Sequence, residues 1–228
     1  YAIQKMMATY YPEYPQMDPL VKSSLSERTL ELTKKTSLFG NLNEIAQVTE
    51  SLYPQTMEEI DHPLGYLLYE TEVEMDAEEE RLRIIDARDR VQVYANDQLI
   101  ATQYQEEIGQ DLFLNGKKKT ITNLKLLIEN MGRVNYGHKL LADTQRKGIR
   151  TGVCIDLHFK LYWKQYALDF SQLDRLNFSK AWQEGRPAFY QFAFHLDQVE
   201  DTYLDMTGFG KGVVFVNGHN LGRFWKVG

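Results

Sequence analysis

The sequence lacks several features that would assign it at once to a class of protein. Its single cysteine, Cys154, excludes a disulfide within the chain, and no apolar run approaches the ~20 residues that a membrane-spanning helix needs. It also lacks an excess of basic residues, and a net charge of -6 does not suit the phosphates of nucleic acid. At 228 residues, 43% of them hydrophobic, the chain can bury an ordinary core without disulfides or metal. We therefore expect a globular protein that binds neither nucleic acid nor membrane.

Motifs for catalysis and cofactor binding are also missing. The sequence has no G-x-S-x-G nucleophile motif, no phosphate-binding glycine loop and no paired Cys/His spacing. Its 32 acidic residues include Glu78–Glu80, which we interpret as a solvated run, and Glu106-Glu107, which we interpret as a strand connection. The five histidines lie on separate segments, at His62, His138, His158, His195 and His219. We expect no metal, no cofactor and no catalytic residue in this chain.

Hydrophobic periodicity predicts one short helix followed by strands. Residues 2–10 place Ile3, Met6, Met7 and Tyr10 on one helical face, and the prolines that follow end the helix. From residue 65 onward the apolar period changes to two, in short segments separated by polar turns. The sequence therefore predicts an all-β fold behind an N-terminal helix.

The second half of the sequence repeats the first. VQVYANDQLI at residues 91–100 has a counterpart in VVFVNGHNL at residues 213–221, and Asn96 and Asn217 occupy the same place after the strand. Asn217 and Gly218 are expected to be structural turn residues, because both residue types tolerate positive φ. Each copy supplies a strand, an excursion and a tight hairpin, which predicts two sandwiches.

Two long motifs carry a resemblance to a known family. LLIENMGRVNYG (Leu126–Gly137) resembles the first C-terminal β-domain of glycoside hydrolase family 35 β-galactosidases, and GKGVVFVNGHNLGRFW (Gly210–Trp225) resembles the last β-domain of the same enzymes. The resemblance implies two jelly-roll, galactose-binding-like β-sandwiches. It implies a helix remnant and linker over residues 1–50, a first sandwich over 51–148 and a truncated second sandwich over 149–228. The catalytic (β/α)8 barrel of the family, with its two glutamates, is expected to lie outside this sequence.

The loop after the first motif's strand is the candidate site. Asn130, Arg133, Asn135 and Tyr136 form a polar cluster that a core role does not explain. One interpretation is a hydrogen-bonded turn, with Arg133 bridging carbonyls or a carboxylate. The other follows from the resemblance: the loop faces the barrel mouth, Tyr136 borders the galactose pocket, and Asn135 and Arg133 contribute to it.

The function implied by the resemblance is that of a non-catalytic region of a retaining β-galactosidase, which hydrolyses terminal β-D-galactosyl residues. The region would buttress the barrel and lend a loop to its substrate pocket, and would be inactive alone. The alternative is an autonomous galactoside-binding module, in which Trp163, Trp182 and Trp225 would form a sugar platform and not pack in cores. The expected partners are the barrel and, through it, a β-galactoside, with a homodimer left open. We expect a cytoplasmic bacterial protein, with a signal peptide upstream of residue 1 as the open alternative.

Overall fold

The computed structural model describes residues 2–14 and 22–227. In chain order, the helices and strands are α1 (Ala2–Tyr10), β1 (Leu32–Ser37), η1 (Phe39–Asn41), α2 (Leu42–Ile45), β2 (Ala46–Ser51), β3 (Tyr66–Glu74), β4 (Glu79–Arg88), β5 (Arg90–Ala95), β6 (Gln98–Tyr104), β7 (Leu112–Asn115), β8 (Ile121–Glu129), η2 (Asp143–Gln145), β9 (Gly148–Ile155), β10 (His158–Phe159), β11 (Trp163–Leu168), η3 (Phe170–Arg175), β12 (Ala188–Phe192), β13 (Lys211–Val216) and β14 (His219–Trp225). Strands dominate and pair antiparallel, so the predicted all-β class with a short N-terminal helix is confirmed. None of the helices within the described ranges is long and apolar enough to cross a membrane.

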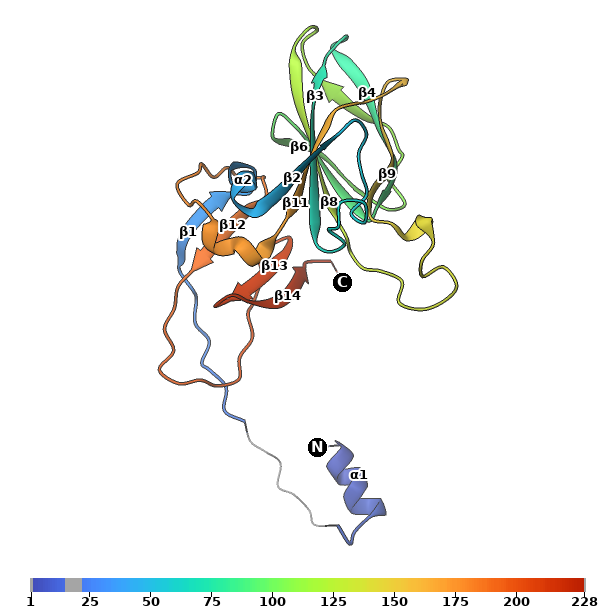
Figure 1. Cartoon of the computed structure of the whole chain (residues 1–228). Helices are drawn as coiled ribbons and strands as arrows, with labels where there is room; N and C mark the ends of the chain where they lie inside the picture. The colour runs from blue at the N-terminus through green and yellow to red at the C-terminus, as the bar shows by residue number, and fades with distance from the viewer. Residues whose placement is uncertain (1, 15–21, 228) are drawn as a thin grey trace. The chain divides into compact units, whose positions relative to one another are not determined.

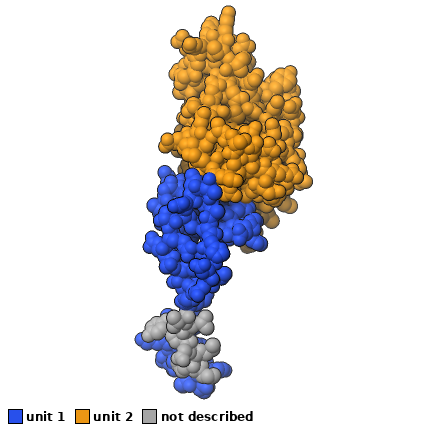
Figure 2. All heavy atoms as spheres, turned by 90° about the vertical axis from the view of Figure 1, so that its left-hand side faces the viewer, with its two compact units in different colours: residues 1–33, 192–228 blue, residues 34–191 orange. Residues whose placement is uncertain are grey.

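The chain divides into two compact units (Figure 2). The larger unit is Lys34–Gln191, and the smaller combines Tyr1–Thr33 with Phe192–Gly228. The larger unit is a sandwich of a six-stranded sheet, in the order β2-β11-β3-β8-β5-β6, and a four-stranded sheet, in the order β10-β9-β4-β7 (Figure 1). Strands β1 and β12 form a separate two-stranded sheet.

The main core of the larger unit lies between its two sheets. Alternate residues of β3, β5 and β8 point inward from the six-stranded sheet and meet alternate residues of β4 and β9. The buried apolar side chains include Leu67, Val91, Leu126, Ile128, Leu82, Ile84, Ile149 and Val153. Their period of two is the pattern from which the strands were predicted.

The outer face of the six-stranded sheet carries a second core, which the sequence did not predict. Leu38, Leu42 and Ile45, from the segment of η1 and α2, pack against sheet residues such as Leu68 and Leu127. For this reason β8 is buried on both faces over most of its length. Residues 34–50, predicted to be linker, therefore belong to the larger unit, and that prediction is corrected.

The predicted boundary between residues 148 and 149 is corrected as well. Strand β9, which begins at Gly148, pairs with β4, and β11 lies between β2 and β3. Both strands are needed to complete the two sheets, so the first sandwich extends well past residue 148. Period-two alternation identified these segments as strands, but it carries no information on which sheet they join.

The smaller unit contains the hairpin that the repeat predicted. Strands β13 and β14 pair across Asn217 and Gly218, which have φ of 50° and 81°, and β5 and β6 pair across Asn96 and Asp97, with φ of 48° and 63°. In each hairpin the register shifts at the second residue before the asparagine, at Tyr94 and Phe215. The two hairpins thus share the conformation of the turn and the position of the bulge as well as the sequence pattern. Helix α1 also forms where predicted, and none of its residues is buried.

Candidate functional site

The candidate site is the long loop between β8 and β9, which projects from the sandwich of the larger unit (Figure 1). Its first residue, Asn130, is buried and anchors it. The Asn130 side-chain amide donates to the carbonyl of Pro63 at 2.8 Å, and its Oδ1 accepts from the Gly132 N–H at 3.0 Å. The backbone N–H of Asn130 donates to the Gly65 carbonyl at 3.0 Å. Asn130 is therefore structural, because its side-chain contacts fasten the loop to the segment before β3.

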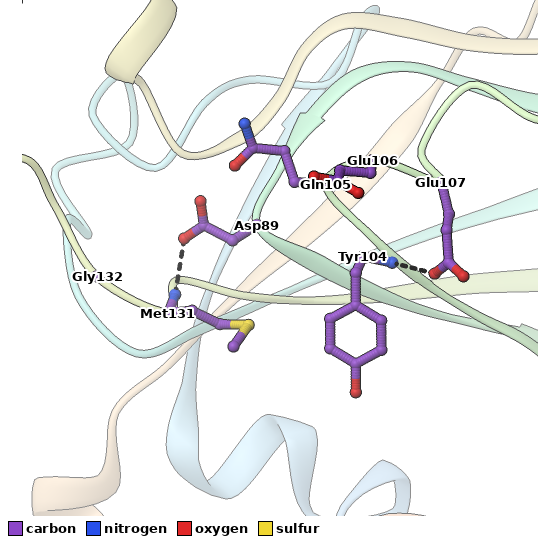
Figure 3. A pocket seen from close by; sticks show the side chains of 7 residues that line it. All are labelled: Asp89, Tyr104, Gln105, Glu106, Glu107, Met131 and Gly132. Carbon is purple, nitrogen blue, oxygen red and sulfur yellow. Dashed lines mark hydrogen bonds between the residues drawn. The ribbon is translucent and has the colours of Figure 1, made fainter. Parts of the chain in front are cut away.

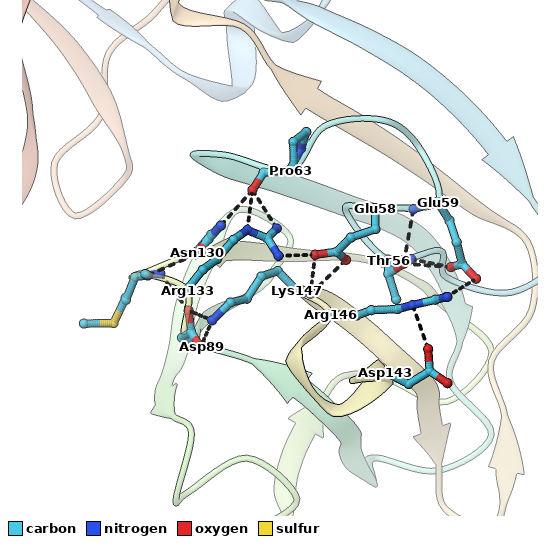
Figure 4. Close-up of polar contacts among 12 residues, drawn as sticks. Thr56, Glu58, Glu59, Pro63, Asp89, Asn130, Arg133, Asp143, Arg146 and Lys147 are labelled. Atoms are coloured by element: carbon cyan, nitrogen blue, oxygen red, sulfur yellow. Dashed lines mark hydrogen bonds and ion pairs between the residues drawn. The ribbon is translucent and has the colours of Figure 1, made fainter. Parts of the chain in front are cut away.

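Arg133 contacts the same segment (Figure 4). Its Nε and Nη2 donate to the Pro63 carbonyl at 3.2 and 2.7 Å, and its Nη1 lies 2.5 Å from Glu58 Oε1. Three of its nitrogens are thus engaged by a carbonyl and a carboxylate of its own domain. This geometry corresponds to the first of the two interpretations of Arg133, a loop fastener.

Tyr136 is placed differently. Its side chain is 88% exposed, and Asn135 beside it is exposed as well. Further along the loop, Leu140 and Leu141 also lie open to solvent. The loop therefore combines a fixed base with an apolar and aromatic tip that its own domain does not bury.

An open hollow of about 550 Å³ lies beside the base of the loop (Figure 3). It is lined by Asp89, Tyr104, Gln105, Glu106, Glu107, Met131 and Gly132. Two of its carboxylates accept backbone hydrogen bonds, Asp89 from Met131 at 2.8 Å and Glu107 from Tyr104 at 2.9 Å. Glu106 and Glu107 stand in the turn that connects β6 to β7. The carboxylates of Asp89 and Glu107 therefore stabilise the backbone around the hollow.

Three carboxylates, Glu70, Asp169 and Asp205, have shifted pKa values, and all three shifts are downward. Burial raises the pKa of Glu70, but hydrogen bonds from Asn123 and the charge of Lys125 outweigh it, so the pKa lies below its usual value. Hydrogen bonds from Ser171 and Thr207 lower the pKa of Asp169 and Asp205. A glycosidase general acid requires the opposite shift, so none of these three residues suits that role. Among the residues described, no group of three His, Cys, Asp or Glu side chains could hold a metal ion.

The three tryptophans do not form a common platform. Trp163 is 1% exposed and packs edge-on against Tyr69 in the core. The amino groups of Lys35 and Lys211 lie over the rings of Trp182 and Trp225, 3.5 and 4.3 Å from the ring centroids. A sugar would have to displace a lysine from either of these ring faces.

Sequence reasoning missed the residues that hold the loop from outside it. Glu58, Pro63 and Asp89 contact its base, yet they lie in segments far from Tyr136 along the chain and match no motif. The only signal in the sequence was the polar cluster of the loop, because its side chains require hydrogen-bond partners elsewhere in the chain. Only the fold could identify those partners.

Comparison with known proteins places these observations in a family. Residues 54–169 match the sequence model for "Beta-galactosidase, first all-beta domain", and residues 187–228 match "Beta-galactosidase, galactose-binding domain". Beta-galactosidase 1 of Dictyostelium discoideum is 33% identical over 239 residues, which cover 92% of this chain and 35% of that protein. Beta-galactosidase 17 of Arabidopsis thaliana is 30% identical over 256 residues, which cover 98% of this chain and 36% of that protein. The chain thus spans about a third of the length of these relatives.

Among solved structures, a GH2 β-galacturonidase from Eisenbergiella tayi matches with a TM-score of 0.35 and 13% identity, over 53% of this chain and 24% of that one. The two sequence matches contain the two motifs. Residues 54–169 include Leu126–Gly137 and most of the sandwich, and residues 187–228 include Gly210–Trp225 and the second hairpin. The chain belongs to the β-galactosidase family and carries residues of its first all-β domain and of its galactose-binding domain.

Proposed function

We propose that this chain is the non-catalytic β-region of a retaining β-galactosidase that removes terminal β-D-galactosyl residues. The region buttresses a catalytic (β/α)8 barrel and contributes the loop with Tyr136 to the edge of the substrate pocket. In support, the named relatives are β-galactosidases, and this chain corresponds to about a third of their length. A homodimer and a cytoplasmic location remain parts of the proposal.

The exposed ring of Tyr136 carries this proposal. An 88% exposed aromatic side chain gains nothing from its own domain, yet the base of its loop is fixed by several hydrogen bonds and ion pairs. Fixing a loop costs conformational entropy. A fixed loop is useful when its tip must contact another surface at a defined place. A phenol ring is suited to the edge of a sugar pocket because it offers an apolar face and a hydroxyl group.

Tyr136→Ala tests the proposal in the longer protein that contains the barrel. We expect kcat/KM for a β-galactoside to fall roughly 5-fold to 150-fold, as the loss of a contact worth about 1 to 3 kcal/mol implies, with little change in thermal stability. Steady-state kinetics and a melting curve measure the two effects. Tyr203→Ala is the matched control, because Tyr203 is also 88% exposed and lies outside the loop. Unchanged kinetics with reduced stability would make the loop structural and remove the pocket from the proposal.

An autonomous galactoside-binding module is the second candidate, which the match to the galactose-binding domain favours. Lysines over Trp182 and Trp225 and the burial of Trp163 argue against a sugar platform. We expect the chain alone to bind galactose or lactose with a Kd above about 1 mM, which corresponds to less than about 4 kcal/mol. Titration calorimetry, with glucose as the control sugar, measures this affinity. Micromolar binding of galactose but not glucose would favour the binding module.

A further inference from the structure

The base of the Tyr136 loop is closed by two carboxylates, and each of them contacts both ends of the loop. The first is Asp89, which lies between β4 and β5. Its oxygens are 2.6 and 2.7 Å from the amino nitrogen of Lys147, the last residue before β9. Its Oδ2 also accepts from the backbone N–H of Met131, near the start of the loop, at 2.8 Å. One carboxylate therefore joins residues 131 and 147.

The second carboxylate is Glu58, in the segment between β2 and β3 (Figure 4). Its two oxygens accept from the backbone N–H of Lys147 at 3.1 and 2.9 Å, and its Oε1 pairs with Arg133. The neighbouring N–H of Met57 donates to the Lys147 carbonyl at 2.9 Å. Lys147 is thus held through its side chain and through both of its backbone polar groups.

The ion pair between Asp89 and Lys147 is largely shielded from water. The Lys147 side chain is 6% exposed and that of Asp89 is 13% exposed. A buried charge is costly unless a partner compensates it, so removing either member leaves the other uncompensated. The pair therefore stabilises one arrangement of the loop base and penalises arrangements that separate the two residues.

We propose that Asp89 and Lys147 are positioning residues for Tyr136. Their ion pair closes the base of the 131–147 loop and so fixes where the exposed ring meets the substrate pocket. The inference rests on the proposed function of Tyr136. Loss of the pair lets the loop base open and moves the ring away from its position, and small displacements of a pocket group reduce catalysis measurably.

Lys147→Met is the main variant, because it removes the charge and keeps an apolar stem of similar length. Asp89→Asn is the second variant, which retains an acceptor for Met131 and loses the charge, and it serves if Lys147→Met fails to fold. Arg150→Met is the matched control. Arg150 pairs with Asp86 at 2.7 Å in a partly buried position between β9 and β4, and neither residue belongs to the loop.

The first measurement uses the chain itself. Amide hydrogen exchange followed by NMR should show the Met131 N–H exchanging about 10-fold faster in Lys147→Met, while the amides in the middle of β3 and β8 keep their rates. Arg150→Met should leave the Met131 rate unchanged. An unchanged Met131 rate in folded Lys147→Met would overturn the inference.

The second measurement is a double-mutant cycle in the longer protein with its barrel. Lys147→Met should lower kcat/KM about 3-fold to 30-fold, and the same change in a Tyr136→Ala background should have an effect of less than about 2-fold, because the ring to be positioned is gone. Equal losses in both backgrounds, or no loss at all in the folded variant, would refute the positioning role. If Tyr136→Ala alone leaves kcat/KM unchanged, the proposed function fails and the inference with it. A loss in Tyr136→Ala without one in Lys147→Met refutes the inference only.

Discussion

Incubated with a chromogenic β-galactoside, the 228-residue chain is expected to show no turnover above the rate without protein. A retaining glycosidase places two carboxyl groups about 5 to 5.5 Å apart and raises the pKa of one of them. In the described residues the shifted carboxylates, Glu70, Asp169 and Asp205, all have lowered pKa values. A chain without such a pair is expected to lack a rate enhancement of at least about 10⁶-fold.

A full-length β-galactosidase assayed at equal concentration provides the positive control for this measurement. Turnover by the chain that survives purification and rises in proportion to its concentration would contradict the assignment. Catalytic groups would then have to be sought among the carboxylates of the sandwich, beginning with those beside the hollow at Asp89 and Glu107.

Gly148→Ala is expected to cause a large loss of stability, larger than that caused by Gly185→Ala. Gly148 has φ of 87°, which disfavours side chains, and a Cβ there would overlap with Tyr69 Oη and lie 3.2 Å from the Met57 nitrogen. Tyr69 cannot move aside easily, because it is fully buried and donates to the Gln55 carbonyl while accepting from the Ile149 N–H. Backbone strain and overpacking together predict a loss of about 2 to 5 kcal/mol. For a chain of this size Tm would fall by roughly 5 to 15 °C.

Gly185→Ala is the control for this prediction. Gly185 has φ of 76°, close to that of Gly148, but a Cβ there meets no atom within 4 Å. It should cost about 1 kcal/mol, from backbone conformation alone. Urea unfolding of both variants separates the two contributions. Equal losses would show that the close approach of Tyr69 to Gly148 is unimportant.

The hairpins were predictable because their information is local. Asn96-Asp97 and Asn217-Gly218 are residue types that tolerate positive φ, and alternating apolar residues flank them. The α1 helix was predictable for the same reason. Each of these elements depends on neighbours within a few positions of the chain.

The domain boundaries were not predictable from such patterns. β11 enters the six-stranded sheet between β2 and β3, and its partners lie about 100 residues earlier in the chain. Leu42 and Ile45 belong to a short helix whose burial depends on the outer face of that sheet. Local sequence identifies a strand or a short apolar segment, but pairing and layering depend on contacts between distant segments.

The sequence by itself determined the family, through the motifs at Leu126–Gly137 and Gly210–Trp225, and it determined the loop on which a function could depend. It left two roles open for Arg133, and the tertiary structure brings Pro63 and Glu58 to its guanidinium group, which is the arrangement of a loop fastener. Only the tertiary structure showed that Asp89 and Lys147 close the loop below Tyr136. The physical reason is that turn and strand preferences act between neighbours, whereas a buried ion pair forms between whichever segments the fold brings together.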